Sequence, residues 1–324
     1  MTMNITRRHL LAGSAGLAVV AGLPAAAQTV TSINMLVPAA PGGGWDQTAR
    51  TMQQVLAASG IAPTMQITNQ GGAGGTIGLA NFLNNQRGRA DAMMTTGLVM
   101  MGAILTNKTP VNLSMTTPIA RLTGEYQVLV TPARSRFNTL ADFVAALRAN
   151  PGAVPVAGGS AGGTDHITLG LLAKVAGADP TKINYVAHAG GGEAQAALLG
   201  NHVAGGISGW GEFSAQVAAG RLRALAIFAP QRLPGIDAPT AKEQGIDLEV
   251  PNWRGVVAAP GITDAQRQAL LNTIDAMVKT PQWQEVLTKN NWGNLYLAGA
   301  DFARYIEEEN RRMTEVLKSI GLVN

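Results

Sequence analysis

The amino-acid sequence predicts an α/β protein in which parallel sheets are covered by helices. Short apolar runs alternate along the chain with segments whose apolar residues recur at helical spacing. Five of these runs end in a glycine-containing loop that leads into a predicted helix. Aromatic residues make up 5% of the chain and charged residues 14%, which is typical of a compact protein rather than a disordered one.

The first part of the chain contains three predicted strands. They cover residues 33–39 (INMLVPA), 64–69 (TMQITN) and 91–97 (DAMMTTG). A helix is predicted to begin at Asp46, which is a favourable N-cap residue, and to end before Gly60. A shorter helix is predicted over residues 77–85.

Strands and helices continue to alternate through the rest of the chain. Strands are predicted over residues 126–132, 153–158, 183–188, 205–209, 222–228 and 254–260, of which the first and last are expected to cross between domains. Helices are predicted to begin at Thr139, Asp165, Glu193, Glu212, Thr263 and Asp301, with capping-box patterns at Thr139 and Thr263. In the helix from Asp165, the core-facing residues are expected to be Ile167, Leu171, Leu172 and Val175.

Residues 1–27 have the features of an export signal. Arg7 and Arg8 precede an apolar stretch that is too short to span a bilayer, and residues 25–27 form a small-residue cleavage site. The surrounding motif favours the twin-arginine route, with the general secretory route as the alternative. We therefore expect a signal peptide over residues 1–27 and a mature protein that acts in the periplasm.

The composition of the mature chain excludes several classes of function. Its length suggests about two domains, and basic and acidic residues nearly balance without any basic run, so no nucleic-acid partner is expected. The chain has no cysteine, which excludes disulfides, thiolate metal sites and a lipid anchor on an N-terminal cysteine. No later apolar stretch is long enough to span a membrane.

The glycine-containing loops indicate an anion site. They occupy residues 42–44, 71–75, 158–163, 190–192 and 208–209, each before a predicted helix. A helix N-terminus carries unpaired N–H groups and a positive dipole end, and glycine lets a ligand oxygen approach the backbone. Because ligands of open α/β sheets lie at the carboxyl ends of the strands, these loops predict a carboxylate or phosphate site.

Nucleotide binding and catalysis are less well supported. No frame of GGAGGTIG fits the dinucleotide fingerprint, and residues 158–163 lack the lysine of a P-loop. Ser160 lies in a G-x-S-x-G pattern, and Asp179 with His188, or Glu193 with His202, follow in the order of a serine hydrolase. The extra glycines after Ser160 and the short spacings make this hydrolase the weaker reading. No histidine pattern indicates a metal, and no cofactor is expected.

Several segments together carry a resemblance to a known family. They are VPAAPGGGWDQTAR, NQGGAGGTIG, GGSAGGTDH, VAHAGGGEAQAALLGNHVAGGISGWGEF and NWRGVVAAPGITDAQR. In this order the chain resembles the substrate-binding proteins of tripartite tricarboxylate transporters, the Bug family, and especially its TctC-like branch. The resemblance implies a type II periplasmic-binding-protein fold, with two α/β domains joined by two crossing strands and a ligand cleft between them. The expected domains are residues 28–130 plus 251–324 and residues 131–250, with hinges near Thr131 and Pro251.

The resemblance also implies which loops grip the ligand. The family's PGGG-x-D segment falls on residues 41–46, and its G-S-x-G loop falls on residues 159–166. Asp46 is expected to cap its helix or order water, because a bare carboxylate would repel an anionic ligand. Trp45 is expected to narrow the pocket, stack on the ligand or shield it from solvent. With the other glycine loops, the candidate ligand-binding residues are Pro41, Gly42, Gly43, Gly44, Trp45, Asp46, Gly72, Ala73, Ser160, Gly162, Gly163, Thr164, His166, Gly191 and Ser208.

The sequence thus predicts a periplasmic solute-binding protein for an organic carboxylate. The resemblance implies capture by hinge closure and delivery to the membrane permease of a tripartite tricarboxylate transporter, with a monomer as the simplest arrangement. A ligand-sensing partner of a membrane kinase would use the same cleft and is the alternative, ahead of a hydrolase based on Ser160. The ligand itself, whether a tricarboxylate, a dicarboxylate or another carboxylate, stays open.

Overall fold

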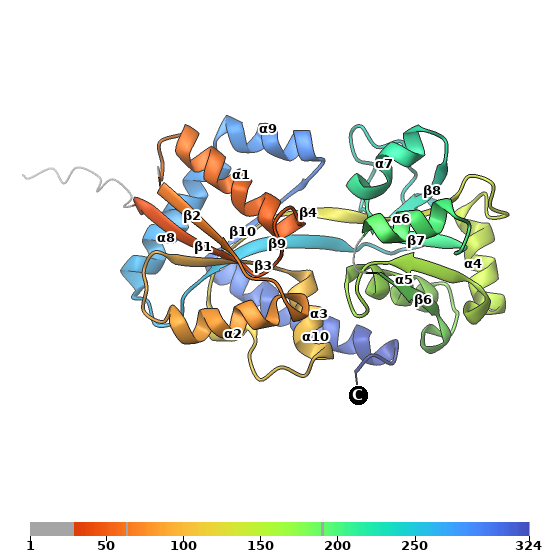
Figure 1. Cartoon of the computed structure of the whole chain (residues 1–324), viewed down its shortest axis with the longest axis horizontal. Coiled ribbons are helices and arrows are strands. Elements are labelled where there is room, and N and C mark those ends of the chain that lie inside the picture. Colours follow the sequence, from red (N-terminus) through yellow and green to blue (C-terminus); the bar gives the residue numbers. More distant parts are fainter. Residues whose placement is uncertain (1–28, 63, 189–190, 324) are drawn as a thin grey trace, which may run out of the picture.

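The computed structural model describes residues 29–62, 64–188 and 191–323. The predicted signal peptide over residues 1–27 lies outside these residues. Two α/β units lie side by side, joined by strands that run through both (Figure 1). Each unit has a hydrophobic core of its own, the first built around side chains such as Trp253 and Phe302 and the second around Phe143 and Phe228.

The first unit contains parallel strands next to antiparallel ones. Strands β2, β1 and β3 pair in parallel in that order, and β9 pairs antiparallel with β3. Strand β4 pairs antiparallel with β9 and β10. The bounds are β1 (Ser32–Val37), β2 (Thr64–Asn69), β3 (Ala92–Gly97), β4 (Thr117–Pro132), β9 (Pro251–Ala258) and β10 (Gly293–Ala298).

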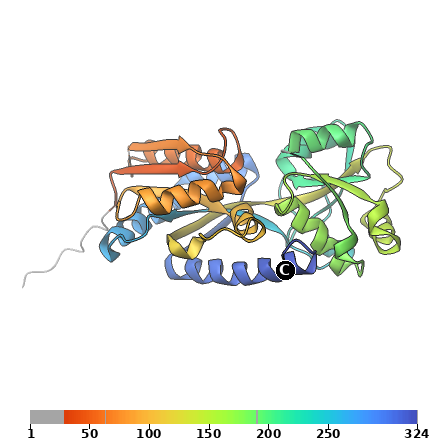
Figure 2. The same cartoon turned by 60° about the horizontal axis from the view of Figure 1, so that its bottom comes forward.

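The helices of the first unit cover both faces of its sheet (Figures 1 and 2). Figure 2 shows α10 running beneath the first unit until its C-terminal end reaches the second. The bounds are α1 (Gly44–Ala58), α2 (Thr76–Asn85), α3 (Leu98–Thr106), α8 (Asp264–Val278), α9 (Pro281–Asn290) and α10 (Gly299–Ser319).

The second unit repeats the alternation of strand and helix. Strands β7, β5 and β6 are parallel, and the end of β4 pairs antiparallel with β7 and β8. The strands are β5 (Pro155–Gly158), β6 (Asn184–Ala187), β7 (Gly205–Gly209) and β8 (Leu222–Ile227). The helices are α4 (Leu140–Ala149), α5 (Thr164–Val175), α6 (Gly191–Leu199) and α7 (Trp210–Ala218).

Strand β4 connects the units because its partners change along its length. Up to Tyr126 it pairs with β9, and from Gln127 it pairs with β7. The pairing therefore changes a few residues before Thr131, whereas the return strand β9 begins at Pro251. The exact domain limits and hinges stay a prediction.

Three local predictions are corrected by the structure. The N-caps of α1 and α5 are Gly43 and Gly163, so Asp46 and Asp165 lie inside the first turn and do not begin the helices. Both carboxylates accept backbone N–H groups from the preceding loop, which explains the N-cap-like sequence pattern. Val175 does not face the core but is 45% exposed, because α5 ends there.

None of the helices in the described part of the chain combines the length and the apolar character that a bilayer crossing requires. Within the same residues, no group of three or more acidic, histidine or cysteine side chains is arranged to hold a metal ion.

Candidate ligand site

The candidate site is formed by helix N-termini at the carboxyl ends of the parallel strands. In Figure 1, the N-terminal ends of α1 and α5 point toward the middle of the molecule, where β4 and β9 pass between the units. Thr164 at the start of α5 donates from its hydroxyl to the Asn252 side chain on β9 at 3.4 Å. The two glycine loops thus meet the crossing strands, as the order of strands and helices predicts.

The loops before α1 and α5 share one backbone conformation. Gly42 and Gly162 have φ values of +86° and +76°, in the left-handed region that favours glycine. The next residues, Gly43 and Gly163, are extended, with φ/ψ of −74°/169° and −77°/178°. Glycine runs at both places therefore serve the same turn into a helix.

Each loop is closed by a side chain four residues after its left-handed glycine. The Gly42 N–H donates to Asp46 Oδ2 at 2.8 Å, and the Gly162 N–H donates to His166 Nδ1 at 3.2 Å. Asp46 and His166 are therefore equivalent positions of the two units. In both segments, GGGWD and GGTDH, the closing residue is the fifth. The equivalence is not visible from residue type, because one closing residue is an aspartate and the other a histidine.

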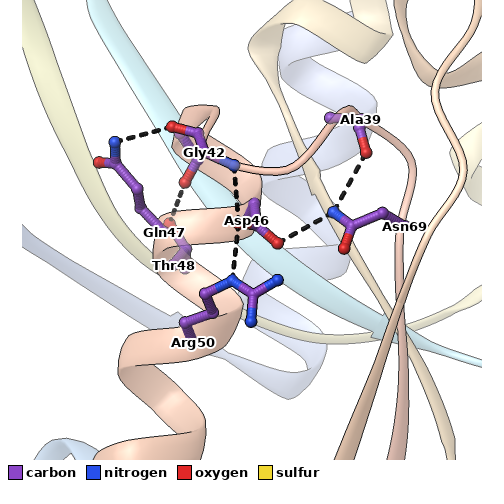
Figure 3. A network of polar contacts seen from close by, with 8 residues as sticks. Ala39, Gly42, Asp46, Gln47, Thr48, Arg50 and Asn69 are labelled. Carbon is purple, nitrogen blue, oxygen red and sulfur yellow. Dashed lines mark hydrogen bonds and ion pairs between the residues drawn. The ribbon is translucent and has the colours of Figure 1, made fainter.

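Asp46 is held by donors from three directions (Figure 3). It accepts from the Gly42 N–H, from Arg50 Nε at 2.8 Å and from Asn69 Nδ2 at 2.9 Å. Burial alone would raise the pKa of Asp46, but these hydrogen bonds outweigh it and hold the pKa below its usual value. Its oxygens thus accept hydrogen bonds from the protein's own loop and from neighbouring side chains.

His166 is neutral at ordinary pH. Its ring stacks on Tyr185 with centroids 4.1 Å apart, and burial lowers the pKa of His166 to about 4. Since Nδ1 accepts a hydrogen bond, the ring proton belongs on Nε2. The Tyr185 hydroxyl donates to the Gly159 carbonyl at 2.8 Å, which fixes both rings against the loop.

Helices at the site lack the side-chain caps that other helices have. Among the helices whose N-cap the structure describes, five begin after a glycine without a side-chain hydrogen bond, namely α1, α2, α3, α5 and α7. By contrast, threonine side chains cap α4, α8 and α9. The first N–H groups of a helix have no partner within it, so these uncapped ends offer donors to an anion. Outside this group, α10 also begins without a side-chain cap.

Trp45 lies over two of these N-termini. A Cβ on Gly75 would lie 2.8 Å from the indole of Trp45, and one on Gly97 would lie 2.9 Å from its Nε1. These glycines are the N-caps of α2 and α3, and Trp45 is only 9% exposed. The indole therefore covers these two helix ends, whereas Gly42 and Gly43 before α1 are exposed.

Carboxylates gather on the second unit's side of the site. Burial raises the pKa of Asp165 to about 7, and the nearby carboxylates of Glu212 and Glu125 add to the rise. The Ser208 hydroxyl donates to Glu212 Oε2 at 3.0 Å, so this predicted ligand residue is engaged with the protein. Burial also raises the pKa of Glu212.

The remaining predicted residues lie around these loops. Pro41, Gly72, Ala73 and Ser160 are exposed. Gly191 is the first residue of α6. Residues 72–75 all have positive φ, including Ala73 at +48°, which is strained backbone for a residue with a Cβ. Five residues at the site could not be recognised from the sequence. Asn69, Tyr185, Asn252 and Arg254 contact the loops or helix starts from other elements, and Glu125 pairs with Arg254.

The geometry does not support the hydrolase pairings. Ser160 forms a turn in which its carbonyl accepts the Gly163 N–H at 3.0 Å, so the helix does not follow it directly. Asp179 accepts hydrogen bonds from Thr181 rather than from His188. His188 Nδ1 instead lies 4.0 Å from Glu193. Asp179 and His188, which the sequence suggested as an acid–histidine pair, therefore each lie against another residue.

Comparisons with known proteins agree with this architecture. The family model described as "Tripartite tricarboxylate transporter family receptor" matches residues 48–322. The chain is 32% identical over 288 residues to the protein BugT of Bordetella pertussis, covering 83% of both chains. It is 26% identical to a TctC solute-binding protein from Polaromonas, with a TM-score of 0.73 and 89% and 98% of the two chains covered.

Two ligand-bound structures share the fold. MatC from Rhodopseudomonas palustris, solved with malate, is 22% identical with a TM-score of 0.71, covering 88% of this chain and 98% of its own. An R. palustris protein solved with adipate is 21% identical with a TM-score of 0.75, covering 90% and 97%. With the matching family model and the BugT relationship, the chain belongs to the tripartite tricarboxylate transporter receptor family, which comprises the TctC and Bug solute-binding proteins.

Proposed function

We propose that this protein binds an organic carboxylate between its two units in the periplasm and delivers it to a tripartite tricarboxylate transporter permease. The observation that carries the proposal is the matched pair of glycine loops before α1 and α5, whose helices begin without a side-chain cap. Two such N-termini offer N–H donors and positive dipole ends to one anion. The match to a receptor family and the likeness to a TctC solute-binding protein support binding rather than catalysis.

The class of ligand is a small carboxylate, in particular a dicarboxylate. Malate and adipate, the ligands of the two R. palustris structures, both carry two carboxylates. In this chain the accessible part of the first loop is the backbone of Gly42 and Gly43. Trp45 covers the neighbouring helix ends and limits the space for a larger group.

A substitution of Gly43 by Asp tests the proposal directly. Gly43 already has the extended backbone of an N-cap, and a Cβ there would meet only the Ala40 carbonyl at an ordinary 3.6 Å. The new carboxylate would cap α1 and occupy the anion site, so Gly43→Asp should stabilise the free protein by up to about 1 kcal/mol. It should also abolish binding in a thermal-shift screen of malate, adipate and citrate, where a ligand at 100 times its Kd adds roughly 2.7 kcal/mol.

Ala298 offers a matched control. It is the uncapped N-cap of α10, with an extended backbone. Ala298→Asp should also stabilise the free protein but leave the carboxylate response intact. If the wild type responds to carboxylates and Gly43→Asp still binds them with unchanged affinity, the ligand is not held by α1 and this site assignment is wrong.

A further inference from the structure

Arg254 on β9 places a guanidinium against the start of α1. The Arg254 side chain is 8% exposed. Its Cζ and Nη2 lie 2.6 Å from the point that a Cβ of residue 44 would occupy. Gly44 therefore lacks a side chain because Arg254 needs the space, and a basic group stands directly beside the helix N-terminus of the candidate site.

The guanidinium is only partly satisfied by the protein. Nη2 donates to the carboxylate of Glu125 on β4, and the guanidinium carbon lies 5.2 Å from the ring centroid of Trp292. Nη1 is buried and has no hydrogen-bond partner among the described residues. A buried donor without an acceptor destabilises the protein, and more so when it is charged, so this arrangement favours an added acceptor.

The electrostatics point to an anion as that acceptor. A cation next to a helix N-terminus is repelled by the positive dipole end, and Glu125 compensates one charge. Glu212 lies near enough for the charge of Arg254 to act on its carboxylate. Its Oε2, however, already accepts a hydrogen bond from Ser208. An anionic group seated on the N–H groups of α1 would be attracted by the helix end and by Arg254 together.

We propose that Arg254 makes the charged contact with the ligand carboxylate and that Glu125 is a positioning residue that holds the guanidinium in place. The inference rests on the proposed function and narrows it. Backbone N–H groups can donate to an amide oxygen as well as to a carboxylate, whereas an arginine adds a positive charge that favours the carboxylate. This site should therefore select an ionised acid over the uncharged amide of the same shape.

The test measures calorimetric affinities of the mature protein for malate, adipate and hexanediamide, the uncharged diamide of adipate. Arg254→Gln should weaken binding of the dicarboxylate by about 10- to 100-fold, and Arg254→Lys should restore part of it. Glu125→Gln should give a smaller loss of affinity for the dicarboxylate and a reduced preference for the acid over the amide. The double variant Glu125→Gln/Arg254→Gln leaves no unpaired buried charge and guards against a loss due to misfolding.

Arg121 provides the matched control. It lies on the neighbouring strand β4, with its guanidinium 4.2 Å from the ring centroid of Tyr305 and its Nε donating to the Leu295 carbonyl. Arg121→Gln should leave the affinity within about twofold. A wild type that binds dicarboxylates together with an Arg254→Gln variant of equal affinity and equal acid preference would overturn this inference alone. A wild type that binds none of the probes counts against the proposed function itself.

Discussion

At the residue scale, the two matched loops differ in the charge of the side chain that closes them. Asp46 remains ionised because three donors surround it. His166 remains neutral because burial opposes its protonation. The residue beside it, Asp165, accepts the Gly159 N–H at 2.8 Å yet is surrounded by other carboxylates. The second loop is thus closed without a fixed charge, and Asp165 is the group there that responds to pH.

Asp165 is expected to make the protein less stable as pH rises. Burial raises the pKa of Asp165 to about 7, above its unfolded value, so the folded state binds more protons between about pH 4 and pH 7. The contribution of Asp165 to the free energy of unfolding is therefore fully present below pH 4 and is lost as pH rises through 7. Asp165→Asn keeps an acceptor for Gly159 and should raise stability at pH 8 by on the order of 2 kcal/mol, but little at pH 4.

Urea denaturation at both pH values measures this difference. Asp179 serves as the opposite case, because hydrogen bonds from Thr181 and the nearby Lys182 hold its pKa below the usual value. Asp179→Asn should therefore lose a little stability at pH 8 rather than gain it. An Asp165→Asn variant that gains nothing at pH 8 would show that the carboxylate is ionised there at no cost.

At the element scale, the sequence predicted the order of strands and helices where the pattern is local. Apolar runs followed by a glycine loop correctly marked β1, β2, β5, β6 and β7 and the helices behind them. Helix α3 was missed because its sequence LVMMGAILT is buried on most sides and has no polar face to set a helical period. The antiparallel pairing of β4 with β9 and β10 joins distant parts of the chain, which periodicity cannot reveal.

The same distinction between local and long-range features applies to the candidate site. Both glycine loops, Asp46 and His166 could be found from the sequence, because glycine runs before a helix are a local signal. The approach of Arg254 to Gly44 depends on the register between β9 and its neighbours. Nothing near residue 254 in sequence indicates that contact.

The C-terminal end of α10 is expected to tie the two units together. A Cβ on Gly170 of α5 would lie 2.3 Å from Cγ2 of Ile320, which is 5% exposed. Replacing a helical glycine by alanine usually stabilises a helix, by up to about 1 kcal/mol. Gly170→Ala should instead destabilise the protein by about 1–3 kcal/mol, because the methyl group displaces the end of α10.

Gly211 in α7 is the control for this element, because a Cβ there meets nothing within 4 Å. Gly211→Ala should be neutral or stabilising in the same chemical denaturation. If the Gly170→Ala variant is as stable as the Gly211→Ala variant, the end of α10 can move aside without loss of stability. In that case α10 does not hold the second unit.

At the scale of the whole molecule, the described residues of the two units contact each other at three places besides the strand pairing. Thr164 reaches Asn252 at the glycine loop, and the end of α10 packs on α5. Helix α3 of the first unit also meets the second loop, since a Cβ on Gly102 would lie 2.7 Å from the Gly162 carbonyl oxygen. This last contact involves backbone, so a side chain at 102 could be accommodated only by moving the units apart.

Gly102→Leu should therefore act as a wedge against closure. If carboxylate binding requires the two units to close, the variant should lose affinity by about 10-fold or more, and Gly102→Ala should lose less. Small-angle scattering with saturating dicarboxylate should show a smaller radius of gyration for the wild type and little change for Gly102→Leu. Circular dichroism should be unchanged, because the shortest contact of the new Cβ is with the Gly162 carbonyl oxygen of the other unit. Unaltered affinity in Gly102→Leu would contradict closure at α3 and place the ligand in a site that the open protein already forms.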